Sequence, residues 1–465
     1  MGRDTPGGAD GQRSFGFLVE QSRPVLRHHV AHGEPGSRLA GGRRLAFDHR
    51  TRRRSPRSAV SAGTQGAAHP PLLRTSDEII DRGYVKRAAA HRDVRPVVAT
   101  STIVAAWAAW RAYLTWPVSG LSWHFFADGS KLLLHGSGLN IYAEHPELQI
   151  GPLSLAVAAL LRPLSASVAQ TVALVAMTIA GPLLVAAITP LVAPARRHLR
   201  MFLAAMLVVP AWTVLSVRFG HLDDVIAMIC AIVALRAVVA DRPVLAGAAL
   251  AAAVAAKPWA LGFLPLLLVL PRGRLRAAVI AAAGTLAAWA PFVLFNVRTF
   301  NALHPPVNLT PASGLHTLGA RGDTVPAWGR TTQLVLAPAA ALGAGLMKRW
   351  PGVLLVCLAV RLALDPQDNG YYIGSAALAA AVFDLLGTGW TIPWTTLSTV
   401  VVLWQPFVHD FAHRLQTTTG ITHWWFAHPG GVGALHLAWS LAMVVIVAIV
   451  PVRELARAGQ PDDGC

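Results

Sequence analysis

The chain has 465 residues, of which 54% are hydrophobic and only 14% are charged, and its mean hydropathy is +0.48. A soluble globular chain carries about 25% charged residues, so this composition excludes an ordinary water-facing surface, and its apolar content excludes an intrinsically disordered chain. The apolar residues come in runs of roughly 20, the length of a bilayer-spanning helix. We therefore expect an all-α fold, a polytopic transmembrane helix bundle in the cell membrane.

The formal net charge is +17, with basic residues in the N-terminal region and in the short links between apolar runs. In a soluble chain a pI near 11.2 would indicate nucleic acid. Basic links between apolar runs instead follow the positive-inside rule, so we expect contact with membrane lipid and no nucleic-acid partner. The three cysteines, Cys230, Cys357 and Cys465, have no paired spacing and indicate neither a disulfide framework nor a metal cluster.

Residues 1–95 are rich in Gly, Pro, Ser and Arg and include the run RTRRRSPR at 50–57. This composition predicts a disordered, basic cytoplasmic tail that can touch anionic lipid. The alternative is that translation starts further downstream. The remainder divides into a transmembrane module at 96–300, which includes a first outer loop at 118–150, and C-terminal transmembrane helices and outer loops at 301–465.

The apolar runs after residue 95 predict about twelve crossings, with both termini in the cytoplasm. The predicted helices are 98–116, 165–192, 201–217, 223–240, 243–256, 259–270, 277–297, 331–347, 351–364, 371–388, 391–408 and 433–451. Two full spans do not fit within 243–271, and Lys257-Pro258 lies in its middle. We expect a pair of short helices or a re-entrant hairpin there, which makes this break a candidate functional site.

The same topology places 118–150, 218–222, 298–330, 365–370 and 409–432 outside the cell. The first of these holds three acids and three histidines (Asp128, Glu144, Glu147, His124, His135 and His145). We expect a short interfacial helix at 128–135, and interface anchors in the aromatic residues Trp116, Trp123, Phe125 and Phe126. Function is expected on this outer face, where loops carry chemistry on a fixed scaffold.

Charged residues elsewhere have both structural and functional interpretations. Asp223 and Asp224 open a predicted helix, either as a pair that complements the helix dipole or as a second carboxylate site. Arg361 lies four residues before Asp365, the spacing of a helical ion pair. Arg111 and Asp384 can reach an interface, so all three charges within apolar runs (Arg111, Arg361, Asp384) are expected to be structural.

The last outer segment contains His409, Asp410, His413 and the cluster His423-Trp424-Trp425-Phe426. A structural or carbohydrate-contacting role is expected for these residues. No metal ligand is assigned: a divalent ion is possible at Asp223-Asp224, but the ligand spacing is too sparse to indicate one.

Several motifs together resemble the polyprenyl-phosphate-dependent glycosyltransferases of the GT-C superfamily, in particular the actinobacterial mannosyltransferase-like members. In the first outer loop the matching residues are Asp128, Gly136, Tyr142, Pro146 and Gly151-Pro152. The later matches are RFGHLDD at 218–224, AAAVAAKPWALGFLPLLLVL at 251–270 and, more loosely, DPQDNGYY at 365–372.

The resemblance implies inverting transfer of a sugar, with mannose favoured, from a polyprenyl-phosphate donor to a hydroxyl of a glycan or glycolipid acceptor. No cofactor is assigned. It implies Asp128 as the general base, alone or paired with His124. It places Lys257, Arg218 and His221 near the donor phosphate. Further substrate-binding candidates are Asp223, Asp224, Glu144 and Tyr142.

The alternative is a multi-pass membrane transporter, since about twelve helices with both ends inside also describe many carriers. A carrier is expected to have repeat-related halves with paired broken helices. The sequence contains one such break, at 257–258, without a convincing counterpart in 298–451. The acid-rich first outer loop also favours the transferase.

Overall fold

The computed structural model describes residues 94–193, 196–303, 307–367, 369–403, 424 and 427–452. Over these residues the chain is helical, and one isolated antiparallel bridge joins Asn308 and Thr324. The expected all-α class is confirmed for this part of the chain. Residues 1–93, on which the prediction of a disordered basic tail falls, lie outside the described residues. The division of the membrane part into a module at 96–300 and C-terminal helices and loops at 301–465 stays a prediction.

Every predicted apolar helix has a helical counterpart. These are α2 (Val94–Thr115), α6 (Ala166–Ile188), α7 (Arg197–Thr213), α8 (Leu222–Val239), α9 (Pro243–Ala256), η5 (Pro258–Val269), α10 (Arg274–Phe295), α12 (Ala327–Leu346), α13 (Val353–Ala363), α14 (Tyr372–Val382), α15 (Trp394–Val402) and α18 (Pro429–Ile449). Four helical segments are long and apolar enough to cross a membrane: Ala166–Leu191, Arg197–Phe219, Arg274–Phe295 and Pro429–Ile449. This is the pattern of a multi-pass membrane protein, while the number of about twelve crossings stays a prediction.

Two interruptions in this helical pattern have local causes. Lys257 is extended, with φ −148° and ψ 114°, because the following Pro258 disfavours the helical conformation in the residue before it. The predicted break between two short helices is therefore confirmed at this residue. The second interruption is the reversal between α7 and α8, where α7 widens into a π-helical turn over Val214–Phe219 and Gly220 reverses the chain with φ +67°.

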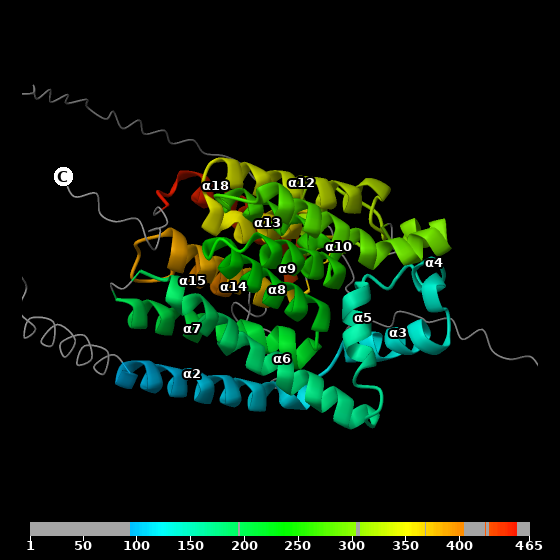
Figure 1. Ribbon diagram of the computed structural model, residues 1–465, viewed down its shortest axis with the longest axis horizontal. Coiled ribbons are helices and arrows are strands. Elements are labelled where there is room, and N and C mark those ends of the chain that lie inside the picture. The colour runs from blue at the N-terminus through cyan, green and yellow to red at the C-terminus, as the bar shows by residue number, and fades with distance from the viewer. Residues whose placement is uncertain are drawn as a thin grey trace, which may run out of the picture. The chain divides into compact units, whose positions relative to one another are not determined.

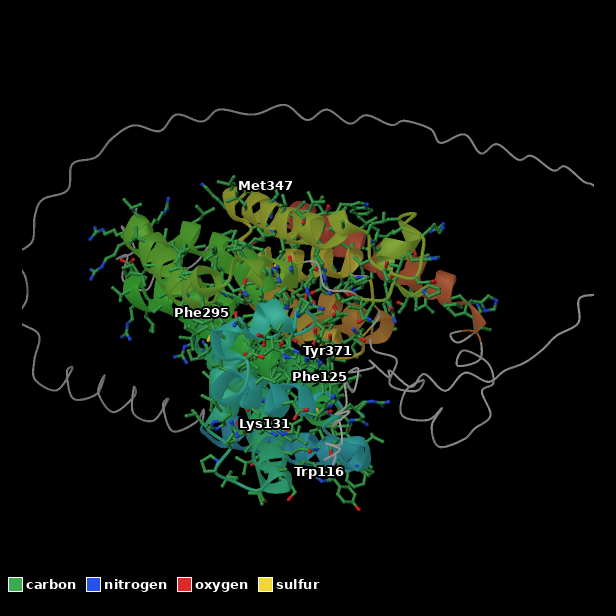
Figure 2. The ribbon with its side chains drawn as sticks, turned by 90° about the vertical axis from the view of Figure 1, so that its right-hand side faces the viewer. Trp116, Phe125, Lys131, Phe295, Met347 and Tyr371 are labelled. Carbon is green, nitrogen blue, oxygen red and sulfur yellow. The ribbon has the colours of Figure 1, made fainter. Side chains whose placement is uncertain are left out.

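The predicted first outer loop and the residues that directly follow it form three short helices, α3 (Trp123–His135), α4 (Ile141–Glu144) and α5 (Pro152–Ala159). They lie together at the end of the bundle where α2 finishes (Figure 1). Figure 2 looks onto this end, where α3 carries Phe125 and Lys131. The helix begins five residues earlier than expected.

The prediction that Trp123 and Phe126 anchor the protein in the interface is wrong. Their exposed fractions are 4% and 1%, because this face of α3 packs onto the bundle. Exposed aromatic side chains include Trp110 and Tyr113 of the C-terminal half of α2, and Trp116, which directly follows that helix.

Hydrogen bonds join the links between helices at both ends of the bundle. At one end, Thr310 N donates to Pro366 O, and Asn296 donates to Asn140. At the other end, arginines of the predicted cytoplasmic links donate hydrogen bonds to distant chain segments: Arg196 to Thr391, Arg200 to Asp384 O and Thr388 O, and Arg349 to Val450 O. The assignment of the first end to the cell exterior stays a prediction.

Candidate functional site

The first turn of α8 carries two buried carboxylates. Asp223 and Asp224 both have 0% exposure, and Asp223 Oδ1 also accepts a hydrogen bond from the Asp224 backbone N–H at 2.9 Å. Carboxylates in a first turn complement the helix dipole, as the structural interpretation expects. Burial makes that interpretation incomplete, because two adjacent ionised groups inside a bundle require a cation nearby.

Lys257 supplies that cation from the break between α9 and η5. Its ammonium contacts Asp223 Oδ2 and lies 3.2 Å from Asp224 Oδ2. His221 Nδ1 lies 3.3 Å from Asp223 Oδ1 and 3.5 Å from Asp224 Oδ2. The structure thus brings four of the predicted site residues into direct contact. We call His221, Asp223, Asp224 and Lys257 the acidic cluster.

Aromatic rings cover this cluster. The imidazole of His221 stacks on Tyr371 with ring centroids 3.5 Å apart, and the buried Phe126 of α3 presents its ring edge-on at 6.0 Å. Phe219 lies beside both His221 and Tyr371, at 6.3 and 5.4 Å. These rings exclude water from the carboxylates and strengthen their electrostatic interactions.

A second group of buried polar residues lies where α12 meets α13. Arg361 Nη2 is 3.6 Å and Arg330 Nη1 is 3.8 Å from Asp365 Oδ2. Gln333 Nε2 donates to the same oxygen at 3.2 Å and to Arg361 O at 2.9 Å. The predicted helical ion pair between Arg361 and Asp365 is confirmed. We call Arg330, Gln333, Arg361 and Asp365 the arginine cluster.

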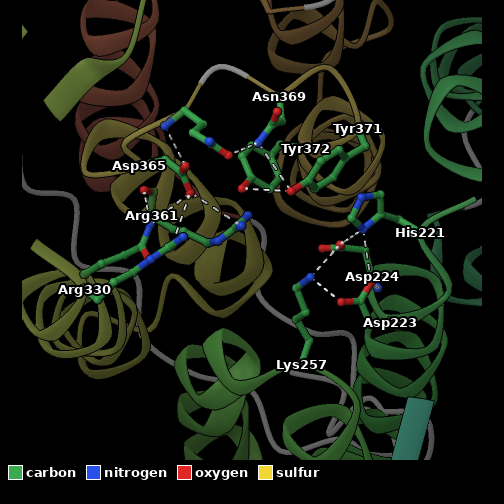
Figure 3. A network of polar contacts seen from close by, with 12 residues as sticks. His221, Asp223, Asp224, Lys257, Arg330, Arg361, Asp365, Asn369, Tyr371 and Tyr372 are labelled. Atoms are coloured by element: carbon green, nitrogen blue, oxygen red, sulfur yellow. Dashed lines mark hydrogen bonds and ion pairs between the residues drawn. The ribbon is translucent and has the colours of Figure 1, made fainter. Parts of the chain in front are cut away.

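Tyrosines connect the two clusters, as Figure 3 shows. The hydroxyl of Tyr371 donates to that of Tyr372 at 3.1 Å, and the guanidinium of Arg361 lies 4.1 Å from the ring centre of Tyr372. Arg361 also lies 4.9 Å from the ring centre of Trp259, two residues after Lys257. The two clusters and the two tyrosines form one polar network with three carboxylates and three cations, so its charges balance when His221 is neutral.

The predicted first outer loop and the start of α5, which directly follows it, are anchored to the two chain segments that carry the acidic cluster. Gly120, Leu121 and Ser122 donate main-chain hydrogen bonds to Val217, Arg218 and Phe219, just before His221. Gly151 N donates to Ala256 O at 3.0 Å, and the Ser154 hydroxyl donates to the same oxygen at 3.2 Å, next to Lys257. The loop and the acidic cluster therefore belong to one structural unit.

A side chain at position 151 would break the second anchor. A Cβ added to Gly151 would lie 2.2 Å from Ala255 O and 2.4 Å from Ala256 O, closer than real contacts allow. The Gly151-Pro152 pair thus permits α5 to start directly against the end of α9.

The remaining predicted site residues are His124, Asp128, Glu144, Tyr142 and Arg218. His124 and Asp128 are one turn apart on the exposed face of α3, whereas Phe126, which faces His221, points from the opposite side of that helix. The expected single-face placement of His124 and Asp128 is confirmed, and their catalytic role stays a prediction.

Glu144 is exposed on α4. Tyr142 is buried: its hydroxyl donates to Ile150 O at 2.8 Å, and its ring packs against Trp289 and Phe292. These contacts give Tyr142 a role in holding the loop. Arg218 is 8% exposed, with its guanidinium 6.0 Å from the ring centre of Phe219.

Among the charges expected to be structural, Asp384 is the best defined. Its carboxylate accepts hydrogen bonds from Thr395 N, Thr396 N and the Thr396 hydroxyl, so it caps the start of α15 from another helix. The predicted histidine and aromatic group of the last outer segment falls on positions 409–413 and 423–426, of which only Trp424 is among the described residues.

Ligand atoms of His221, Asp223 and Asp224 lie within 4.8 Å of one another, a spacing that could hold a metal ion. The ammonium of Lys257 already contacts both carboxylates, so a metal ion would have to replace it. Within the described part of the chain, Oδ1 of Asp224 is buried and accepts no hydrogen bond. The acidic cluster can therefore accept a proton or a hydroxyl hydrogen bond from a ligand.

Sequence reasoning identified the acidic cluster but not Arg330, Gln333, Tyr371 and Tyr372 as site residues. Two signals were available. Arg330 and Gln333 are three residues apart at the start of a predicted helix, and the tyrosines end the DPQDNGYY segment.

Comparisons of the chain with protein-family models, curated proteins and solved structures give no match.

Proposed function

We propose that the chain is a membrane glycosyltransferase that moves a sugar from a polyprenyl-phosphate donor to a hydroxyl acceptor with inversion, and that the buried polar network is its substrate site. The observation that carries this proposal is the pair of anchors between the first outer loop and the acidic cluster. They connect the loop that the resemblance singles out with a buried polar network, in which the acidic cluster is able to take up a proton and the arginine cluster is able to meet a phosphate.

In this reaction the acceptor oxygen forms a bond to the anomeric carbon, and the bond from that carbon to the phosphate oxygen breaks. The hydroxyl proton passes to a carboxylate, and polyprenyl phosphate leaves. Removing a general base of this kind typically lowers the rate by about 10²–10⁴-fold.

Two carboxylates are candidates for the base. The resemblance favours Asp128, with His124 beside it on the exposed face of α3. Burial and an oxygen that accepts no hydrogen bond favour Asp224. Lys257 contacts two carboxylates at once, which supports a role in orienting them more than a role in binding phosphate.

The test is sugar transfer by purified protein in nanodiscs, supplied with a radiolabelled polyprenyl-phosphate mannose and a lipid acceptor. Asp128→Asn and Asp224→Asn are compared, with Asp323→Asn, an exposed loop carboxylate, as the matched control. The base variant should lose at least about a hundredfold in rate while the control is unchanged. If both variants retain more than about a tenth of the activity, neither is the base. If the unmodified protein transfers no sugar, the cell-envelope glycan profile of a deletion strain decides whether another sugar or acceptor is used; an unaltered profile overturns the proposal.

A proton-coupled transporter is the second candidate, and one observation favours it. Three carboxylates and three cations balance one another inside the bundle, and the acidic cluster lies at two interruptions of its helices. Buried ionisable chains of this kind occur in carriers. A carrier would move a solute into proteoliposomes in response to a pH gradient without consuming a lipid donor. The transferase would consume the lipid donor and would move no solute in response to the gradient.

A further inference from the structure

We infer that Arg330 and Arg361 form a binding site for an oxyanion, specifically a phosphate ester, where α12 meets α13. The inference deepens the proposed function by locating the donor phosphate, and it rests on that function only for the lipid nature of the ligand. The acidic cluster is a poor place for this group, since it holds two carboxylates against one ammonium and has a net charge of −1 when His221 is neutral.

The arginine cluster has the opposite imbalance. Two guanidinium groups share one carboxylate, that of Asp365, which leaves a local surplus of one positive charge. The side chains of Arg361 and Asp365 are 4% and 1% exposed, so water screens this surplus little. A monoanionic phosphodiester carries the charge that would match it.

Asp365 does not satisfy the arginines. Its Oδ1 accepts from Gln367 N at 3.1 Å and its Oδ2 from Gln333 Nε2 at 3.2 Å. The distances to Asp365 Oδ2 are 3.6 Å from Arg361 Nη2 and 3.8 Å from Arg330 Nη1. Both are beyond the usual range of about 2.7–3.2 Å for such hydrogen bonds. The carboxylate is thus occupied by other donors.

Donor groups of both arginines are unused. Among the described residues, the Nε atoms of Arg330 and Arg361 are both buried and donate no hydrogen bond. Arg330 Nη1 donates to Gln333 Oε1 at 2.9 Å, while Gln333 is held in turn by Arg361 O and Asp365. Buried charged donors without an acceptor are rare, which points to a ligand that supplies the oxygens.

The geometry suits a contact between the planar guanidinium group of Arg361 and the oxygens of a phosphate. The guanidinium of Arg361 contacts two rings, 4.9 Å from the centre of Trp259 and 4.1 Å from the centre of Tyr372, and these contacts hold it in position. A fixed guanidinium presents paired N–H groups to phosphate oxygens, and an ammonium does not. Arg330 is the more exposed of the two, at 14% of its side chain, so the ligand reaches the site from its side.

The proposal is tested by binding to the full-length protein in nanodiscs, with inorganic phosphate and farnesyl phosphate as separate probes. Arg330→Gln removes the surplus positive charge. Arg330→Lys keeps the charge but lacks the paired N–H groups of a guanidinium. The matched control is Arg298→Gln, at an exposed arginine of η6 (Val297–Leu303). We expect both probes to bind, at least a tenfold weaker affinity in Arg330→Gln, a smaller loss in Arg330→Lys, and no change in the control. Each variant is checked for an unchanged elution profile.

Two results would overturn the site: no binding of either probe to the unmodified protein, or affinities in Arg330→Gln within twofold of the unmodified values. Binding of inorganic phosphate with no gain from the prenyl chain supports the oxyanion site and identifies a soluble ligand, which contradicts the lipid donor of the proposed function. Tighter binding of farnesyl phosphate supports both. The sugar-transfer assay judges the proposed function separately, because it does not depend on Arg330 being the phosphate ligand.

Discussion

Lys257→Met is the substitution that most directly examines the acidic cluster. Methionine keeps the length of the side chain and removes its charge, leaving Asp223 and Asp224 buried, adjacent and without their common cation. The side chain of Lys257 is 9% exposed and those of both aspartates are 1% exposed, so water replaces little of the lost interaction. Removing one partner of a buried ion pair typically costs about 3–5 kcal/mol, and we expect a loss of that size in the free energy of unfolding.

The double variant Lys257→Met/Asp223→Asn provides the diagnostic comparison. It restores the balance of charges, with Asp224, Asp365, Arg330 and Arg361 remaining. Replacing both partners of a buried pair is often close to neutral, so the double variant should recover at least about 2 kcal/mol relative to Lys257→Met alone. Lys131→Met, at an exposed lysine of α3, is the control and should stay within about 0.5 kcal/mol.

Unfolding is measured in mixed micelles by titration with a denaturing detergent, followed by tryptophan fluorescence. A loss below about 1 kcal/mol for Lys257→Met, or a double variant no more stable than the single one, would refute the reasoning. Either result would mean that the two carboxylates are not both ionised in the folded protein.

Three further predictions concern packing, capping and topology. Gly151→Ala places a methyl group against two carbonyl oxygens and should lower stability by about 1–3 kcal/mol, whereas Gly343→Ala, with nothing within 4 Å, should be neutral or slightly stabilising in the same titration. Asp384→Ala removes the acceptor of two buried main-chain donors and should cost at least about 2 kcal/mol; a loss under half of that means the amides find other acceptors. Cysteine at position 131 should react with an impermeant thiol reagent on intact cells, in a background without the native cysteines, and cysteine at 276 should not; the reverse pattern inverts the topology.

Local rules were sufficient to predict the helices and several site contacts. The break at Lys257 follows from the proline after it, and the Arg361–Asp365 pair follows from helical spacing. The carboxylates of the acidic cluster were recognisable because two adjacent acids at the start of an apolar helix are unusual. Each of these inferences uses residues within about one helical turn of each other.

Contacts between distant helices could not be predicted in the same way. Arg330 and Arg361 come from different helices, so no local spacing brings them together. The helix α14, which begins at Tyr372, is buried along its length, so its sequence has no polar face that would indicate its neighbours. The aromatic residues of α3 were misinterpreted for a related reason. Trp123 and Phe126 have the composition of interface anchors, and only the packing of α3 on the bundle reveals that they are buried.

The three consecutive main-chain hydrogen bonds from Gly120–Ser122 to Val217–Phe219 limit how the outer loop can move. Each contributes about 0.5–1.5 kcal/mol net, and they would have to break together for the start of α3 to swing away as a lid. Any gating motion is therefore confined to the far half of the loop, between the end of α3 and α4. The start of α3 is hydrogen-bonded to the segment that contains Phe219, which lies beside His221. An antibody fragment bound to the start of α3 would therefore restrict the motion of the segment that carries His221.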